Sequence, residues 1–257
     1  MKKEVSIQLA DYPESLRLFL ENSKAYDTSS HSGAKVLYLD RGYYLKIDSK
    51  ESLHQEAQRI KWFAKEDLGV PLIQYISSDK DYLLTKAADG LDATHFLQEP
   101  EKICQAMAKA LRELHQLRPA DFPTNHHLVH YRKVAQENYE KGYFYPKALL
   151  PQFGITSREE AYQLIQEKGH LLVENALIHG DACLPNIILK EDATFSSFID
   201  VGLAGMSDRH IDIYWVIWSL HYNLGSAAYG DIFLDHYGRN QVDQEKLRLV
   251  AAFEAFG

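Results

Sequence analysis

The pattern of hydrophobic and polar positions in the first part of the chain predicts a small antiparallel sheet with one helix. Its strands are expected at four short apolar runs, residues 34–39, 43–47, 70–77 and 82–85. Asp40-Arg41-Gly42 separates the first two runs and has the composition of a tight hairpin turn. Residues 51–66 repeat apolar side chains at helical spacing, so we expect an amphipathic helix there.

The pattern changes after Asp89-Gly90, where helical spacing becomes dominant. Apolar residues recur at helical spacing through 103–114, and Ser157 followed by Glu160 forms a capping box that opens a helix to about residue 168. Further helices are expected at 211–220 and 243–256, and short strands at 176–178, 187–189 and 198–199. The sequence therefore predicts an α+β fold with two lobes, 1–87 and 88–257, in which the second lobe is larger and mostly helical.

Composition and charge exclude some classes of partner. Of the 257 residues, 46% are apolar and 25% are charged, which is ordinary for a globular protein. The formal net charge is −8, which argues against a basic face for nucleic acid. An acidic protein attracts cations at long range, so the charge fits a cationic small molecule without specifying one. No apolar run reaches the ~20 residues that a membrane span needs, and we expect no membrane partner.

The two cysteines, Cys104 and Cys183, are far apart in the sequence and indicate neither a zinc site nor a disulfide framework. The N-terminal residues turn polar within a few positions and do not have the form of a signal peptide. Both features favour a cytoplasmic protein, because thiols stay reduced in that compartment. We expect a monomer or a weak dimer.

The chemistry is concentrated in the segment His179-Gly-Asp-Ala-Cys-Leu-Pro-Asn186, which lies between two expected strands. Fourteen residues further on, another expected strand ends in Ile199-Asp200-Val201-Gly202. A carboxylate can accept the proton of an attacking hydroxyl, while carboxylate and amide oxygens hold Mg²⁺ against phosphates. Kinase catalytic loops have the same order, His-x-Asp-x-x-x-x-Asn followed by Asp-x-Gly. The pattern therefore predicts phosphoryl transfer, since an Asp that merely caps a turn does not account for the whole set.

The first lobe offers an independent indication. Lys46 lies within an apolar strand, and Glu56 lies on the apolar face of the following helix. Such a pair can position the α- and β-phosphates of a nucleotide, although each residue alone is more commonly a surface residue. The loop 28–34 contains Ser32 and Gly33 and can cover phosphates with backbone N–H groups, but it has no G-x-G-x-x-G run. Asp212, at the start of a helix, is interpreted as structural support.

These segments, together with Asp208-Arg-His-Ile-Asp212, resemble the aminoglycoside 3'-phosphotransferases. The first motif is specific, and weaker similarity extends over nearly the whole chain. The resemblance implies a bilobal protein-kinase-like fold with ATP or GTP between a nucleotide-binding lobe, 1–87, and a catalytic and substrate-binding lobe, 88–257. It also implies a role for each of several residues: Asp181 as catalytic base, Asn186 and Asp200 as Mg²⁺ ligands, Lys46 paired with Glu56, Tyr44 stacked on adenine, and Ser32, Thr85, Ala88 and Ile199 around the nucleotide.

The departures from the family pattern are on the acceptor side. Leu203 follows the Asp-x-Gly motif where the family has Arg, and Tyr222-Asn223 stands where acidic residues are frequent. Residues 142–151 are aromatic and apolar, and the C-terminal segment has one acid, Glu254. Glu254 and Asn223 are the residues we expect to contact the acceptor. With fewer local carboxylates, we expect a preference for less highly charged aminoglycosides, or for a neutral hydroxylated compound.

The leading hypothesis is an ATP- and Mg²⁺-dependent transfer of the γ-phosphoryl group to a hydroxyl of an aminoglycoside, of the 3'-OH type, with antibiotic resistance as the consequence. A second reading keeps this reaction and changes the acceptor to another small hydroxylated metabolite or natural product. A third reading is an inactive nucleotide-binding module. The presence of Lys46, Glu56, Asp181, Asn186 and Asp200 together argues against the third.

Overall fold

The computed structural model describes residues 3–29, 33–123 and 126–257. The chain forms two compact units, Met1–Asp89 with Ser197–Gly202, and Gly90–Ser196 with Leu203–Gly257. The first boundary between the units lies between Asp89 and Gly90, two residues after the predicted lobe boundary at residue 87. The return of Ser197–Gly202 to the first unit was not predicted, and it matters for the site because Asp200 lies in this segment.

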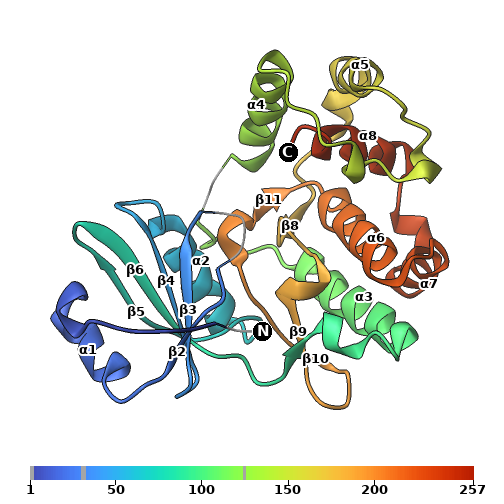
Figure 1. Ribbon diagram of the computed structural model, residues 1–257. Coiled ribbons are helices and arrows are strands. Elements are labelled where there is room, and N and C mark those ends of the chain that lie inside the picture. The colour runs from blue at the N-terminus through green and yellow to red at the C-terminus, as the bar shows by residue number, and fades with distance from the viewer. Residues whose placement is uncertain (1–2, 30–32, 124–125) are drawn as a thin grey trace. The chain divides into compact units, whose positions relative to one another are not determined.

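The first unit is built on one antiparallel sheet of six strands in the order β1-β2-β3-β4-β6-β5 (Figure 1). The strands are β1 (Lys3–Val5), β2 (Ala25–Asp27), β3 (Lys35–Leu39), β4 (Tyr43–Ser49), β5 (Leu72–Ser77) and β6 (Lys80–Lys86). The predicted hairpin is confirmed, with Gly42 at a φ of +83° and its N–H 2.9 Å from the Leu39 carbonyl oxygen. Such a φ favours glycine, which explains why this turn is readable from the sequence.

The two faces of this sheet carry different side chains, because successive side chains along a strand point to opposite faces. Leu37, Leu39 and Leu45 lie in a core that also contains Leu16 and Leu20 of helix α1 (Glu14–Leu20). The opposite face carries Lys46 on β4, whose partner Glu56 is on helix α2 (His54–Lys65). The prediction of one helix in this lobe is wrong, because the short helix α1 precedes α2. With seven residues, α1 spans barely two turns and gives little periodic signal.

The segment Ser197–Gly202 is tied to the first unit by contacts around α2. The Phe198 N–H donates to the Leu68 carbonyl oxygen at 2.8 Å, and the Phe198 ring meets Phe63 edge-on at 6.1 Å between centroids. Arg59 of α2 donates to the carbonyl oxygen of Gly202. A Cβ on Gly202 would lie 3.3 Å from Glu56 Oε2, so glycine permits the close approach of this turn to the helix. These contacts fix Asp200 beside α2.

The second unit is mostly helical, as predicted. Its helices are α3 (Pro100–Gln116), α4 (His127–Glu140), α5 (Arg158–Lys168), α6 (His210–Leu224), α7 (Ala228–Tyr237) and α8 (Gln244–Glu254). Its short strands are β7 (Leu91–Asp92), β8 (Ala176–Ile178), β9 (Ile187–Leu189), β10 (Phe195–Phe198), which runs across the unit boundary, and β11 (Gly205–Ser207). The strands form the sheets β10-β9-β7 and β11-β8. The predicted α+β class is confirmed.

Local signals explain which helices of this unit were predictable. The Ser157 hydroxyl of the predicted capping box accepts the Glu160 N–H at 3.1 Å, and α5 begins at the next residue after Ser157. Helix α4 was missed because it buries only Leu128 and Ala135 and therefore lacks an apolar stripe. Helix α7 was missed because Gly230 interrupts its pattern.

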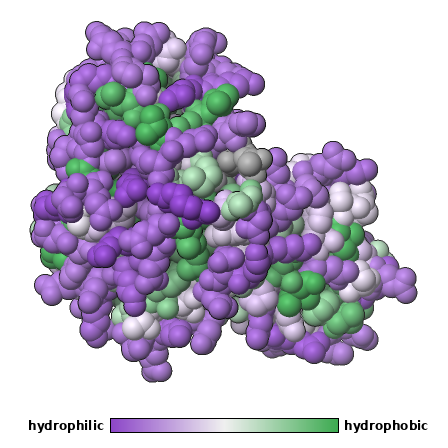
Figure 2. All heavy atoms as spheres, turned by 180° about the vertical axis from the view of Figure 1, so that it is seen from behind, coloured by the Kyte–Doolittle hydropathy of each residue, from purple (hydrophilic) through white to green (hydrophobic). Residues whose placement is uncertain are grey.

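The surface in Figure 2 carries hydrophobic residues in several separate areas among hydrophilic ones. Among the residues that the structure describes, none of the helices is long and apolar enough to span a membrane.

Candidate active site

The loop between β8 and β9 holds the residues of the predicted catalytic motif. Gly180 has a φ of +88°, and a Cβ there would lie 2.5 Å from the Leu203 carbonyl oxygen. Only glycine fits this conformation and this approach. The N–H of the next residue, Asp181, lies 3.2 Å from His179 Nδ1. The loop is therefore held in a sharp turn that presents Asp181 at its outer end.

Asp181 and Asn186 are brought together by the loop. Asn186 Nδ2 donates to Asp181 Oδ2 at 2.8 Å and to the Asp181 carbonyl oxygen at 3.0 Å. Both amide protons are thus used, and the amide oxygen of Asn186 is left for another partner. The Asp181 side chain also hydrogen-bonds to the Cys183 thiol, and its carboxylate still has lone pairs for a proton or a hydroxyl. This arrangement can orient a nucleophile and offer a hard oxygen ligand at one place.

A buried carboxylate, that of Asp212, holds the loop through hydrogen bonds from its backbone. Asp212 of α6 accepts the His179 N–H at 2.7 Å and the Gly180 N–H at 2.8 Å, and its Oδ2 lies 3.0 Å from His115 Nε2. Burial would raise the pKa of Asp212, but its hydrogen bonds and its interaction with His115 outweigh burial and lower that pKa. The interpretation of Asp212 as structural support is confirmed.

His115 was missed by the sequence analysis. It lies in α3, and its Nδ1 is 2.8 Å from the Tyr237 hydroxyl, so both ring nitrogens have partners. The one signal in the sequence is a histidine directly after Leu114, at the end of an apolar stripe. A polar residue at such a place has a buried partner more often than a ligand. The partner itself, Asp212, is far away in the sequence and could not be identified.

The first unit gathers a lysine and two carboxylates. Lys46 Nζ lies 2.9 and 2.8 Å from the two Glu56 carboxylate oxygens and 3.2 Å from Asp200 Oδ1. Burial alone would lower the pKa of Lys46, but the charges of Glu56 and Asp200 outweigh it and raise that pKa. The ammonium group is therefore fixed and charged. The predicted pairing of Lys46 with Glu56 is present, and the additional contact to Asp200 was not predicted.

Asp200 has an unusual backbone conformation, with a φ of +55°. A non-glycine residue in this region is uncommon, although Asp and Asn adopt it more readily than most. The conformation directs the side chain to Lys46 while the carboxylate stays 53% exposed. An exposed carboxylate beside a fixed ammonium suits a shared interaction with a phosphate and its counterion.

The other residues predicted around a nucleotide lie in the first unit. Tyr44 on β4 pairs in register with Thr85 on β6, and the Tyr44 ring packs against Tyr38 with 5.0 Å between centroids. Ala88 follows the end of β6 and Ile199 follows β10, and both are half-buried. Ser32 lies outside the described residues.

The residues predicted to contact the acceptor differ in their surroundings. Glu254 of α8 is buried and accepts a hydrogen bond from the Tyr131 hydroxyl at 2.7 Å. Burial raises the pKa of Glu254 to about 7, and the charge of Asp181 acts in the same direction. Asn223 uses its side-chain amide on its own helix, donating to the Ser219 carbonyl oxygen at 2.8 Å. Of the two, Glu254 is thus the one whose charge interacts with Asp181.

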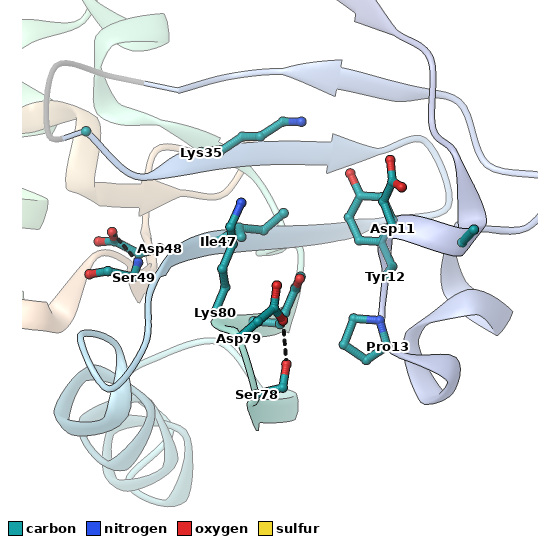
Figure 3. A pocket seen from close by; sticks show the side chains of 13 residues that line it. Asp11, Tyr12, Pro13, Lys35, Ile47, Asp48, Ser49, Ser78, Asp79 and Lys80 are labelled. Carbon is teal, nitrogen blue, oxygen red and sulfur yellow. Dashed lines mark hydrogen bonds between the residues drawn. The ribbon is translucent and has the colours of Figure 1, made fainter.

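A separate open hollow lies in the first unit, lined by residues of β3, β4 and β6 and by Ala10–Pro13 (Figure 3). Its lining residues include Lys35, Asp79 and Lys80. The Ser78 hydroxyl donates a hydrogen bond to Asp79 Oδ1 at 2.9 Å. Its lining does not include Lys46 or Asp200. We assign no chemistry to this hollow, because its charged groups are of mixed sign and converge on no common point.

Comparisons with known proteins identify the family, and a solved structure shares the fold. The family model of the phosphotransferase enzyme family matches residues 27–250. A probable aminoglycoside 3'-phosphotransferase of Lactococcus lactis is 40% identical over 99% of this chain and 98% of that protein. An aminoglycoside 3'-phosphotransferase of Niallia circulans is 31% identical over 96% of this chain and 97% of that protein. A solved aminoglycoside phosphotransferase of Streptomyces rimosus, 22% identical, superposes with a TM-score of 0.75 over 98% of this chain and 99% of that one.

The chain therefore belongs to the phosphotransferase enzyme family. Its relatives in Lactococcus lactis and Niallia circulans are named as a probable aminoglycoside 3'-phosphotransferase and an aminoglycoside 3'-phosphotransferase. The predicted resemblance, the protein-kinase-like fold and the class of enzyme, an O-phosphotransferase, are confirmed.

Proposed function

We propose that this protein transfers the γ-phosphoryl group of ATP to the 3'-hydroxyl of an aminoglycoside, in the cytoplasm, and thereby confers resistance to that antibiotic. The observation that carries the proposal is the Asp181–Asn186 pair, anchored by Asp212. The names of the relatives in Lactococcus and Niallia supply the acceptor class and the hydroxyl. The free thiols of Cys104 and Cys183 fit a reducing compartment.

In this proposal the first unit holds the nucleotide. Lys46 donates to the α- and β-phosphates and is itself held by Glu56. Tyr44 offers an aromatic face to the adenine, and Thr85, Ala88 and Ile199 complete its surroundings. Lys46 carries a single charge and three donors, which suits binding of phosphate oxygens from one side.

Each of the two predicted ligands offers an oxygen of the kind that Mg²⁺ prefers. Asp200 offers an exposed carboxylate, and Asn186 offers an amide oxygen whose direction is fixed by two hydrogen bonds from its nitrogen. Magnesium is commonly bound by one or two protein oxygens together with phosphates and water. When bound, the ion neutralises charge on the phosphates. The proposal assigns Asp200 and Asn186 as its ligands.

Asp181 accepts the proton of the attacking hydroxyl. As the acceptor oxygen forms its bond to the γ-phosphorus, the bond from that phosphorus to the β-γ bridging oxygen breaks, and the hydroxyl proton passes to Asp181. The hydrogen bond from Asn186 to Asp181 Oδ2 orients the carboxylate that accepts this proton. Asp212 takes no part in the transfer and acts by positioning the loop.

A second candidate keeps this reaction and changes the acceptor to another hydroxylated compound. The exposed Leu203 favours it, since this side chain cannot pair with an ammonium group. The experiment that separates the two is a panel of acceptors with ATP and Mg²⁺, in which the phosphorylated product is identified by mass. Phosphorylation of a kanamycin-class compound supports the first proposal. Turnover confined to acceptors without amino groups would replace it with the second.

Replacement of Lys46 by alanine is expected to raise the KM for ATP and to lower kcat, while the KM for the acceptor stays near that of the wild type. The physical reason is that Lys46 contacts phosphate through a charge, and one charge-assisted hydrogen bond contributes about 1.5–3 kcal/mol, or roughly 10- to 150-fold. Steady-state kinetics with each substrate varied in turn measures this. Lys35→Ala, on the neighbouring strand, is the control. Wild-type values for ATP would show that Lys46 is a structural residue.

Glu254 makes acceptor binding depend on pH. With a pKa of about 7, the carboxyl is neutral below this pH and cannot pair with an ammonium group. We therefore expect the acceptor KM to be about 10-fold higher at pH 6 than at pH 8, since a tenth of the sites are ionised one unit below the pKa. The Glu254→Gln variant should have a higher KM and lack this slope. Equal slopes in both proteins would mean that other groups, such as the acceptor's own amines, cause it.

A further inference from the structure

Three aromatic residues form a ledge along one side of α6. Trp215, Trp218 and Tyr222 follow one another at spacings of three and four residues, which places them on the same face of the helix. We call these three residues the aromatic ledge. The Tyr222 side chain at its outer end is 69% exposed.

The ledge is held in a defined geometry. The Tyr222 ring lies nearly parallel to the Trp218 ring, with 5.1 Å between centroids and 12° between planes. Trp218 meets Trp215 edge-on, with 5.4 Å between centroids and 79° between planes. The indole N–H of Trp218 donates to the Lys147 carbonyl oxygen at 2.8 Å. An exposed aromatic face that is fixed in advance loses little conformational entropy when a ligand covers it.

The inner end of the ledge meets the acidic group that is proposed to face the acceptor. The Trp215 side chain hydrogen-bonds to Glu254, and the charge of Glu254 interacts with that of Asp181. The apolar segment 142–151 lines the same region, because the Tyr145 N–H donates to the carbonyl oxygen of Ala255, the residue after Glu254, at 2.7 Å. The ledge thus extends from Glu254 along α6 to its exposed end at Tyr222.

We propose that the aromatic ledge is a specificity-determining subsite, on which an amino-sugar ring of the acceptor lies with its ammonium group against the face of Tyr222. The inference rests on the proposed function and deepens it. A cation placed over an aromatic ring is attracted by the ring's quadrupole without a countercharge. A carboxylate is the usual partner of an ammonium, but Glu254 is partly neutral at pH 7 and lies at the opposite end of the ledge. The apolar face of a sugar ring also packs well on an aromatic ring.

The test measures acceptor binding by full-length variants. Tyr222→Ala and Trp218→Ala are expected to raise the acceptor KM by about 5- to 30-fold, the range for a cation held over an aromatic face. The KM for ATP and the melting temperature of Tyr222→Ala should stay near those of the wild type, because the Tyr222 side chain is mostly exposed. Tyr222→Phe keeps the ring and should lose much less than Tyr222→Ala. Leu18→Ala, which removes an exposed side chain of the first unit, is the control.

A second measurement is independent of turnover. Trp218 belongs to the ledge, so an acceptor that covers the ledge changes the surroundings of this indole. The intrinsic fluorescence of the wild type should therefore change when a kanamycin-class acceptor is titrated, although Trp62 in the first unit contributes a constant background. Tyr222→Ala should need about 5- to 30-fold more acceptor for half of that change.

Wild-type acceptor affinity in Tyr222→Ala, or an equal loss in Tyr222→Phe, would overturn the subsite. A wild-type protein that phosphorylates no aminoglycoside would instead overturn the proposed function.

Discussion

Asp181→Ala is expected to lower kcat by about 10²- to 10⁴-fold, the range contributed by a positioned general base. ATP binding should be retained, since Lys46, Glu56 and Asp200 are untouched. The fold should also be retained, because the loop is anchored by Asp212 through the backbone N–H groups of His179 and Gly180.

The measurement is a comparison of kcat with the affinity for a nucleotide analogue in the same preparation. Asp181→Asn is the matched variant, since it preserves the size of the side chain and removes its basicity. Activity near that of the wild type in either variant would move the catalytic base to another residue. Loss of nucleotide binding together with activity would point to a folding defect, which the melting temperature would reveal.

Asp200→Asn is expected to reduce turnover by at least about 100-fold at limiting Mg²⁺, because replacing even an indirect partner of a metal site costs 10- to 100-fold. An amide lacks the negative charge that a hard dication requires. The substitution is suited to this question, because asparagine tolerates the positive φ of +55° nearly as well as aspartate does. The backbone turn at Val201-Gly202 should therefore be preserved.

A titration of Mg²⁺ at saturating ATP distinguishes the causes. Part of the lost activity should return at high Mg²⁺, because a weakened site fills at higher concentration. Asp192→Asn is the control, since Asp192 is another exposed aspartate, in the turn before β10, that accepts hydrogen bonds from Thr194. Turnover like that of the wild type at limiting Mg²⁺ would exclude a ligand role for Asp200.

Local chemistry explains what could be predicted from the sequence. Gly42 and Ser157 mark a turn and a helix start because each makes contacts within a few residues of itself. The pairing of Lys46 with Glu56 was predictable because a charged residue in an apolar strand needs a partner, and the next helix offers one. In each case, the residues that determine the structure lie close together in the chain.

The parts that were not predicted depend on contacts between distant residues. Asp200 contacts Lys46, although the two residues are 154 positions apart in the sequence. The segment that carries Asp200 packs on α2 through Phe198. His115 finds Asp212 in the same way, over a separation of 97. Periodicity carries no information about such pairs, because it reports on the face of an element and not on its neighbour.

For the residues proposed to contact the acceptor, the structure adds information that the sequence does not contain. The sequence indicated departures at Leu203, Tyr222 and Asn223, which suggested a loss of charge. The structure adds that Tyr222 is stacked on Trp218 and that Glu254 is buried with a pKa of about 7. Reduced charge is thus accompanied by an aromatic surface, which is a positive reason for a preference among acceptors.

That preference has a direct consequence for charged acceptors. An ammonium group that leaves water needs a carboxylate or an equivalent partner, and long-range attraction by the net charge of −8 cannot substitute for it. An acceptor of the kanamycin class should therefore show a higher kcat/KM than one of the more highly charged neomycin class. Equal or higher efficiency for the neomycin class would mean that further acids of the second unit line the pocket.

The most direct measurement uses ATP labelled in its γ-phosphate with two acceptors, a kanamycin-class aminoglycoside with a 3'-hydroxyl and its 3'-deoxy analogue. The account predicts label in the first compound and none in the second, with a strict requirement for Mg²⁺. Equal labelling of both compounds, or consumption of ATP without label in either, would contradict it.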